Sequence, residues 1–154
     1  MKGEIAVVCS RADPASLNIF ERLLEMLDWE AGKDYLSSGR WRLMVHEGRQ
    51  SRLQCLEERL ASLGLEPELI VFASRHEAKS ALPWMGGHFT GFMDEARFSF
   101  SAAAPLALRS FLYNLRHMAL PGFAISAEAT HHDPADFRTP CFFAKLGTPE
   151  EQGP

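Results

Sequence analysis

Four of the six histidines, His76, His88, His131 and His132, lie in segments with little regular hydrophobic periodicity, and Glu128 precedes His131 by three residues. Histidine carries protons near neutral pH and is the commonest metal ligand. A carboxylate can orient a histidine, bind a metal or act as a base. These residue types therefore predict a site for proton transfer or for a metal. Zinc held by histidines with one open position would lower the pKa of a water molecule.

A structural role remains an alternative for each of these histidines. The sequence contains neither an HExxH motif nor a CxxC framework. Adjacent side chains point to opposite sides of an extended strand, so His131 and His132 can share a ligand sphere only if the chain bends there. His46 and His117 lie in a predicted strand and a predicted helix, and we expect structural roles for both.

Two short motifs accompany the histidines. Ser74–His76 places a hydroxyl beside a histidine, but neighbours in sequence seldom have triad geometry. Arg75 is a better candidate for contacting an anion, because its planar guanidinium suits phosphate; a surface ion pair is the alternative. Gly86 and Gly87 precede His88, and their backbone freedom would allow close approach to a ligand. We expect His88 to reach the site from a glycine-rich loop.

Apolar runs alternate with amphipathic stripes along the chain. Strands are predicted at Ile5–Val8, Trp41–His46, Leu69–Ala73, Phe123–Ala127 and Cys141–Leu146; helices are predicted after the Asp13 N-cap and Pro14, over Leu53–Leu63, and from Pro105. This alternation predicts an α/β fold, a mostly parallel sheet with helices on both faces. Ser74–Ser99 is long for a loop, so it carries function or hides short strands.

Ligands of parallel sheets bind beyond the carboxyl ends of the strands. That rule selects three segments, each directly after a predicted strand: Ser10–Asp13, Ser74–His76 and Glu128–His132. We expect the last two to meet at the same edge of the sheet.

The length of 154 residues predicts a single domain. We expect residues 1–147 to form it and residues 148–154 to be a flexible tail. The three cysteines are odd in number and widely spaced, which fits a reduced, cytoplasmic protein. No signal peptide and no membrane span is expected. The net charge of −4 disfavours a protein that coats nucleic acid, although Arg40, Arg42, Arg49 and Arg52 could form a local basic patch or a solvated face.

Several segments in order resemble one family. They are Cys9–Ile19, Phe72–His76, His88–Gly91, Ser101–Pro105, the Glu-Ala-Thr-His-His motif at Glu128–His132, and Pro140–Glu151. Their residues and spacing are similar to those of the D-aminoacyl-tRNA deacylases of archaea and plants. Glu128–His132 is the most specific of these motifs, and the resemblance extends over nearly the whole chain.

The resemblance implies hydrolysis of the ester between a D-amino acid and the 3′ end of tRNA, which is chiral proofreading, with Zn²⁺ as the associated metal and aminoacyl-tRNA as the partner. It implies catalytic roles for Glu128, His131, His132 and His76; substrate contacts for Ser74, Arg75, His88 and Thr90; and metal ligation by His88, His131 and His132.

Two other functions fit the same residues. Members of the family continue beyond the position of Pro154, so we expect either a fragment or a short relative. A short relative could be a catalytically inactive module that binds tRNA or another anion and has lost the C-terminal part of the site. A hydrolase acting on a different small ester or amide is the third possibility.

Overall fold

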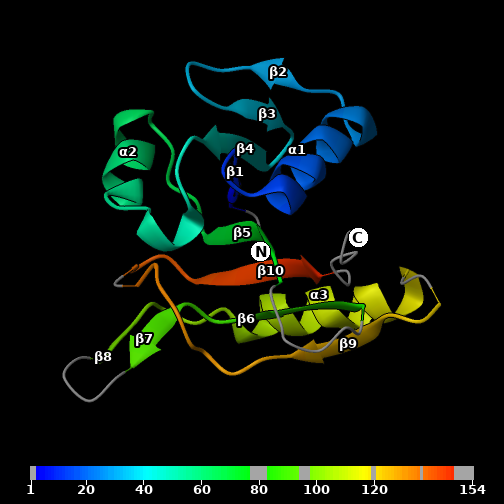
Figure 1. Cartoon of the computed structure of the whole chain (residues 1–154). Helices are drawn as coiled ribbons and strands as arrows, with labels where there is room; N and C mark the ends of the chain where they lie inside the picture. The colour runs from blue at the N-terminus through cyan, green and yellow to red at the C-terminus, as the bar shows by residue number, and fades with distance from the viewer. Residues whose placement is uncertain (1–2, 77–82, 94–97, 119–120, 136, 148–154) are drawn as a thin grey trace.

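The computed structural model describes residues 3–76, 83–93, 98–118, 121–135 and 137–147; the expected tail at 148–154 lies outside them. In this part of the chain, eight strands form one sheet in the order β2-β3-β4-β1-β5-β10-β6-β9 (Figure 1). The strands are β1 Ile5–Ser10, β2 Glu30–Ala31, β3 Leu36–Ser38, β4 Trp41–His46, β5 Leu69–Arg75, β6 Trp84–His88, β9 Ala124–Ala127 and β10 Cys141–Gly147. A separate two-stranded sheet joins β7 Gly91–Met93 to β8 Phe98–Phe100.

The centre of the large sheet is parallel, as predicted. Strands β4, β1, β5 and β10 lie side by side in one direction, with Val7 of β1 opposite Val71 of β5, and Phe72 of β5 opposite Phe143 of β10. All six residues of β1 are buried, which explains its continuous apolar run.

The far side of the sheet reverses direction. Strand β6 is antiparallel to β10, and β9 is parallel to β6. The carboxyl end of β9 therefore points away from the edge where β5 ends. Our expectation that Ser74–His76 and Glu128–His132 follow strand ends at one edge is wrong for this reason. The segment after β9 instead runs to β7 of the small sheet, where His132 forms an isolated bridge with Gly91.

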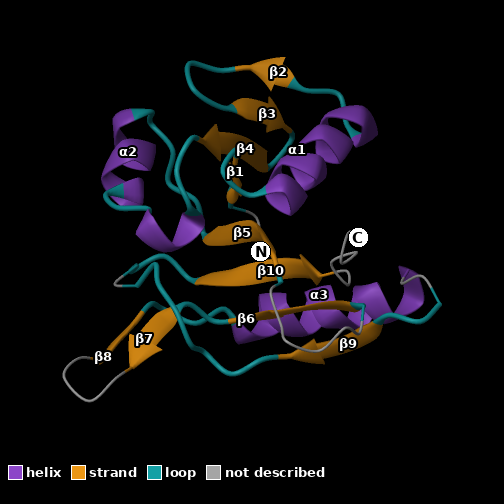
Figure 2. Ribbon diagram, viewed as in Figure 1, coloured by secondary structure: helices purple, strands orange, loops and turns teal. Residues whose placement is uncertain are grey.

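Helices cover both faces of the sheet, as predicted (Figure 2). Helix α1, Pro14–Met26, and helix α3, Pro105–Met118, pack on the face that carries Val7 and Phe142. Helix α2, Leu56–Ser62, packs on the opposite face with Phe143. A 3₁₀ turn, Gln50–Arg52, precedes α2. None of the helices in the described ranges is long and apolar enough to cross a lipid bilayer.

Asp13 caps helix α1 as predicted and also ties it to β5. Its Oδ1 accepts hydrogen bonds from the backbone N–H groups of Ala15 and Ser16, and Pro14 opens the helix. Its Oδ2 accepts from the Ser74 hydroxyl at 2.9 Å and from the Arg75 N–H at 2.7 Å. One carboxylate thus fixes the positions of the two residues that end β5.

Ser74–Ser99, predicted to carry function or hide strands, contains β6, β7 and the start of β8. The role that we expected for Gly86 and Gly87 is wrong. Both lie inside strand β6, and neither has a positive φ angle. A Cβ on Gly86 would lie 2.0 Å from the Ser126 carbonyl oxygen, so glycine is needed here for close strand packing.

Candidate functional site

His88 ends strand β6 and is fully buried on the α2 face of the sheet. Its ring stacks on Phe143, with 5.0 Å between centroids. Its Nδ1 lies 2.7 Å from the Phe89 carbonyl oxygen, and since a carbonyl can only accept, Nδ1 carries the proton. The lone pair is then on Nε2, a buried atom that has no hydrogen-bond partner among the described residues.

His131 and His132 approach His88 from the segment after β9. Their rings lie 4.5 Å and 4.8 Å from that of His88, between centroids. Nδ1 of His131 donates to the Ala129 carbonyl, and Nδ1 of His132 donates to the Asp133 carbonyl, both at 2.7 Å. The chain bends here, so the two adjacent histidines do share one site. Each offers an Nε2 lone pair.

The three histidines form the group of possible metal ligands that the described residues contain. One ligand atom from each lies within 4.8 Å of the others. Burial lowers the pKa of His88 to about 3 and also lowers the pKa of His132, so both rings are neutral near pH 7. Neutral imidazoles whose second nitrogen donates to a carbonyl are typical zinc ligands.

The three histidines therefore fit zinc, but His132 must first give up a hydrogen bond. The ammonium of Lys145 donates to His132 Nε2 at 2.8 Å. His132 can bind a metal only after Lys145 releases it, whereas His88 Nε2 has no partner to release in the part of the chain that the structure describes.

A cavity of about 330 Å³ lies beside the histidines. Its lining includes Asp13, Arg49, Gln50, Ser74, Arg75, His131, His132 and Lys145. Ser74, Arg75, His131 and His132 therefore do converge, although the sheet edge that we invoked is not the reason. The Ser74 hydroxyl is held by Asp13, so it is not poised as a nucleophile.

His76 and Glu128 form a pair apart from the three-histidine cluster. His76 Nδ1 lies 3.4 Å from Glu128 Oε1, and its ring packs on Trp84 with 4.1 Å between centroids. The other carboxylate oxygen of Glu128, Oε2, is buried without a hydrogen-bond partner among the described residues. Burial lowers the pKa of His132, and the charge of Glu128 is a smaller effect in the opposite direction, so Glu128 acts electrostatically on the cluster.

Comparison with known proteins identifies the family. A family model described as D-aminoacyl-tRNA deacylase matches residues 63–152, more than half of the chain. The chain belongs to the D-aminoacyl-tRNA deacylase family. A D-aminoacyl-tRNA deacylase of Methanothrix thermoacetophila is 45% identical over 96% of this chain and 55% of its own length. One of Pyrococcus horikoshii is 29% identical over 95% of this chain and 58% of its own length.

Solved structures agree on the fold. The crystal structure of a conserved protein of unknown function has a TM-score of 0.86 and 28% identity, and the match covers 97% of this chain and 56% of that one. A purine nucleoside phosphorylase of Toxoplasma gondii has a TM-score of 0.50 and 12% identity over 95% of this chain and 77% of that one, which shows the fold alone. The chain spans about half the length of the curated deacylases it matches.

The predicted residue Thr90 is not on the cavity wall of this deacylase-family chain. Its side chain is buried, and its hydroxyl lies 3.1 Å from Cys141 Sγ. Lys145 is the residue that the sequence analysis missed. The sequence did contain a signal for it. Lys145 interrupts the apolar run of strand β10, and its side chain lies on the same face of the sheet as that of Phe143.

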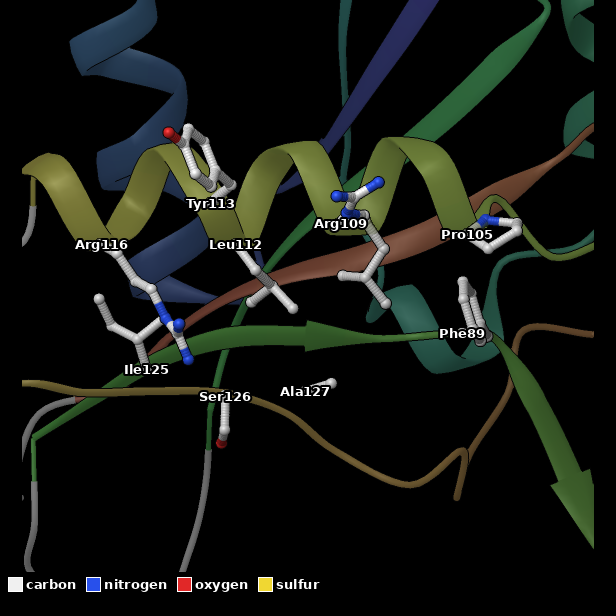
Figure 3. A pocket seen from close by; sticks show the side chains of 10 residues that line it. Phe89, Pro105, Arg109, Leu112, Tyr113, Arg116, Ile125, Ser126 and Ala127 are labelled. Carbon is white, nitrogen blue, oxygen red and sulfur yellow. The ribbon is translucent and has the colours of Figure 1, made fainter.

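A second cavity, of about 540 Å³, lies between α3 and β9 (Figure 3). Figure 3 shows Leu112 and Arg116 pointing from α3 toward the strands below it, with Arg116 beside Ile125. This cavity lies on the other face of the sheet, because Leu112 packs with Phe142, whereas His88 stacks on Phe143. It is therefore separate from the histidine site.

Proposed function

We propose that this chain carries the hydrolytic site of a D-aminoacyl-tRNA deacylase, which acts in the cytoplasm and releases a free D-amino acid and tRNA. The observation that carries this proposal is the convergence of one ring nitrogen from each of His88, His131 and His132 beside a cavity with cationic side chains. Membership of the deacylase family supports the same reaction.

We propose Zn²⁺ as the cofactor, held by His88, His131 and His132. A zinc ion bound there would act as a Lewis acid toward the ester carbonyl and the attacking water. The three backbone carbonyls accept from Nδ1 of each ring, which leaves Nε2 as the atom that would bind the ion.

Glu128 is the candidate base of the reaction. Its buried Oε2, which has no hydrogen-bond partner within the described ranges, could accept a proton from the attacking water, while His76 contacts Oε1. The water oxygen bonds to the ester carbon, the bond from that carbon to the ribose oxygen breaks, and the ribose oxygen receives the proton. No redox partner is required.

Arg75 and Arg49 are the candidate contacts of the tRNA backbone. Both line the cavity, and both are exposed. A guanidinium can bind a phosphate through two parallel hydrogen bonds. Such contacts supply affinity that depends on salt, and they do not select a sequence. Ser74 lies in the same wall and is a second polar contact.

Deacylation of D- and L-aminoacyl-tRNA, each measured with zinc and with a chelator, tests the proposal. We expect a fall of at least about tenfold in the single-turnover rate of D-aminoacyl-tRNA deacylation in each of Glu128→Gln, His131→Ala and His132→Ala. Positioned acid–base groups typically raise a rate by about 10²–10⁴-fold. His117→Ala on α3 is the control. If the parent is active and all three variants keep its turnover, the catalytic site is wrongly assigned. If D- and L-aminoacyl-tRNA are hydrolysed at equal rates, the proposed preference for the D-enantiomer is wrong.

A non-catalytic tRNA-binding module is the second candidate. The cavity wall supports it as well, because Arg49, Arg75 and Lys145 could hold an anion without any hydrolysis. An inactive parent that binds uncharged tRNA, with an affinity that falls steeply with salt, would support this alternative.

A further inference from the structure

Strand β10 places a lysine in the protein interior. Lys145 is 7% exposed, and its Nζ lies 5.4 Å from the Phe143 ring centroid and 2.8 Å from His132 Nε2. In the part of the chain that the structure describes, no carboxylate forms an ion pair with it. Burying an ammonium without an ion pair costs free energy, so Lys145 destabilises the fold.

The ammonium has unused hydrogen-bonding capacity toward the cavity. Lys145 pairs in register with Ser74 of β5, and both side chains line the 330 Å³ cavity with Arg75 and His131. An ammonium has three N–H donors, and His132 Nε2 is the acceptor that the described residues provide. At least two donors are therefore left for a ligand in the cavity, and the third is released when His132 Nε2 binds a metal. Unlike the exposed Arg75, Lys145 is held in place by packing.

We propose that Lys145 is a catalytic residue whose ammonium donates to the ester carbonyl oxygen and stabilises the negative charge that develops there. This role rests on the proposed deacylation. As the water oxygen bonds to the carbonyl carbon, the π electron pair moves to the carbonyl oxygen, which accepts an N–H of Lys145. The pair returns when the ribose oxygen leaves and takes up the proton lost by the water. A donor fixed before the reaction is effective because it needs no reorganisation.

Kinetics of Lys145→Met provide the first test. Methionine keeps much of the packing and removes the charge. We expect kcat to fall about 10²–10³-fold, as for loss of one oxyanion donor, with KM changed by less than about threefold. The melting temperature should stay the same or rise. Lys33→Met, at an exposed lysine, is the matched control and should change neither kcat nor melting temperature.

Chemical rescue separates a catalytic from a structural role. Lys145→Ala should be inactive and should regain turnover when ethylamine is added at rising concentration, because the amine can occupy the vacated space. A lower melting temperature with no rescue, or a Lys145→Met variant that keeps its kcat, would overturn the assignment and leave the proposed function standing.

Binding of inert analogues tests Lys145 independently of turnover. The first probe is an adenosine 3′-phosphonate ester that carries a tetrahedral anion in place of the ester carbonyl; the second is the corresponding planar 3′-amide. Lys145→Met should bind the phosphonate at least about tenfold more weakly and the amide about equally, since transition-state mimics report the developing charge. If the parent binds the phosphonate through Lys145 but hydrolyses no ester, the proposed function fails and the lysine's anion-binding role stands. A phosphonate that binds parent and variant equally, or does not bind the parent, overturns the role of Lys145.

Discussion

At Gly87, strand β6 leaves no room for a side chain. An added Cβ would lie 2.3 Å from the carbonyl oxygen of Phe143, which belongs to the neighbouring strand β10. A backbone atom in a paired strand cannot move aside cheaply. We therefore expect Gly87→Ala to lower the free energy of unfolding by about 1–3 kcal/mol, as overpacking typically does. Urea denaturation measures it. Gly48→Ala is the control, since its Cβ would meet only His46 Nδ1 at 3.9 Å; equal losses in the two variants would contradict the packing argument.

Arg75 and Arg116 provide a matched pair for locating the tRNA surface. Arg75 lines the cavity beside the histidines, and Arg116 lines the cavity on the opposite face. We expect Arg75→Ala to weaken tRNA binding and to reduce the slope of log K against log salt by about one. Arg116→Ala should change neither quantity. Filter binding across a salt series measures both variants, and a larger effect at Arg116 would move the tRNA surface to α3.

Among individual residues, the type of side chain was predictable from the sequence and its environment was not. His88, His131 and His132 were candidates because histidine suits both metals and protons. That Thr90 is buried against Cys141, and that Lys145 faces the cavity, depends on which side of a strand each residue occupies. A strand read only as an apolar run does not reveal that side.

At the scale of elements, Glu57 in the first turn of α2 holds the segment that leads into β10. Its carboxylate accepts from the Thr139 N–H and hydroxyl, both at 2.7 Å, and from the Arg138 N–H at 3.2 Å. Burial opposes ionisation, but these hydrogen bonds outweigh it, and the pKa of Glu57 is lowered.

This lowered pKa predicts a dependence of stability on pH. The ionised carboxylate stabilises the fold above the unfolded-state pKa, and the contribution is lost as pH falls through the lower folded-state pKa. Glu57→Gln should therefore cost about 1 kcal/mol near pH 7, and the difference from the parent should shrink below about pH 4.5. Denaturation at a series of pH values measures it. Glu58→Gln, one exposed position further along, is the control; a Glu57 effect that grows toward acidic pH would have the wrong sign.

The parallel centre of the sheet and the starts of α1 and α3 were predictable, because continuous apolar runs, an Asp-Pro cap and helical spacing are local signals. Strand β6 was not, because its two glycines remove the hydrophobic alternation that marks a strand. The direction of β9 was not predictable either. It depends on pairing with β6, so the edge at which Glu128–His132 emerges could not be derived from sequence.

For the whole molecule, metal binding should raise the free energy of unfolding. We expect Zn²⁺ at about one hundred times its Kd to stabilise the chain by about 2.7 kcal/mol, by mass action, and a chelator to reverse the effect. His131→Ala is the informative variant, because His131 is exposed and its loss should not disturb the core. Thermal denaturation with and without zinc measures both proteins. An equal rise in melting temperature for His131→Ala would exclude His131 as a ligand.

The reversal of strand direction after β10 has a consequence for local unfolding. In the described structure, β6 and β9 join the sheet through the β10–β6 ladder. The three-histidine cluster and Lys145 lie across this ladder. His88 is on β6, His131 and His132 follow β9, and Lys145 is on β10. A ligand held by these side chains would cross-link three segments of the outer sheet. Amide hydrogen exchange should then slow in β6 and β9 when the site is filled and stay unchanged in β1 and β4, so that occupancy of the site sets how often this side of the sheet opens.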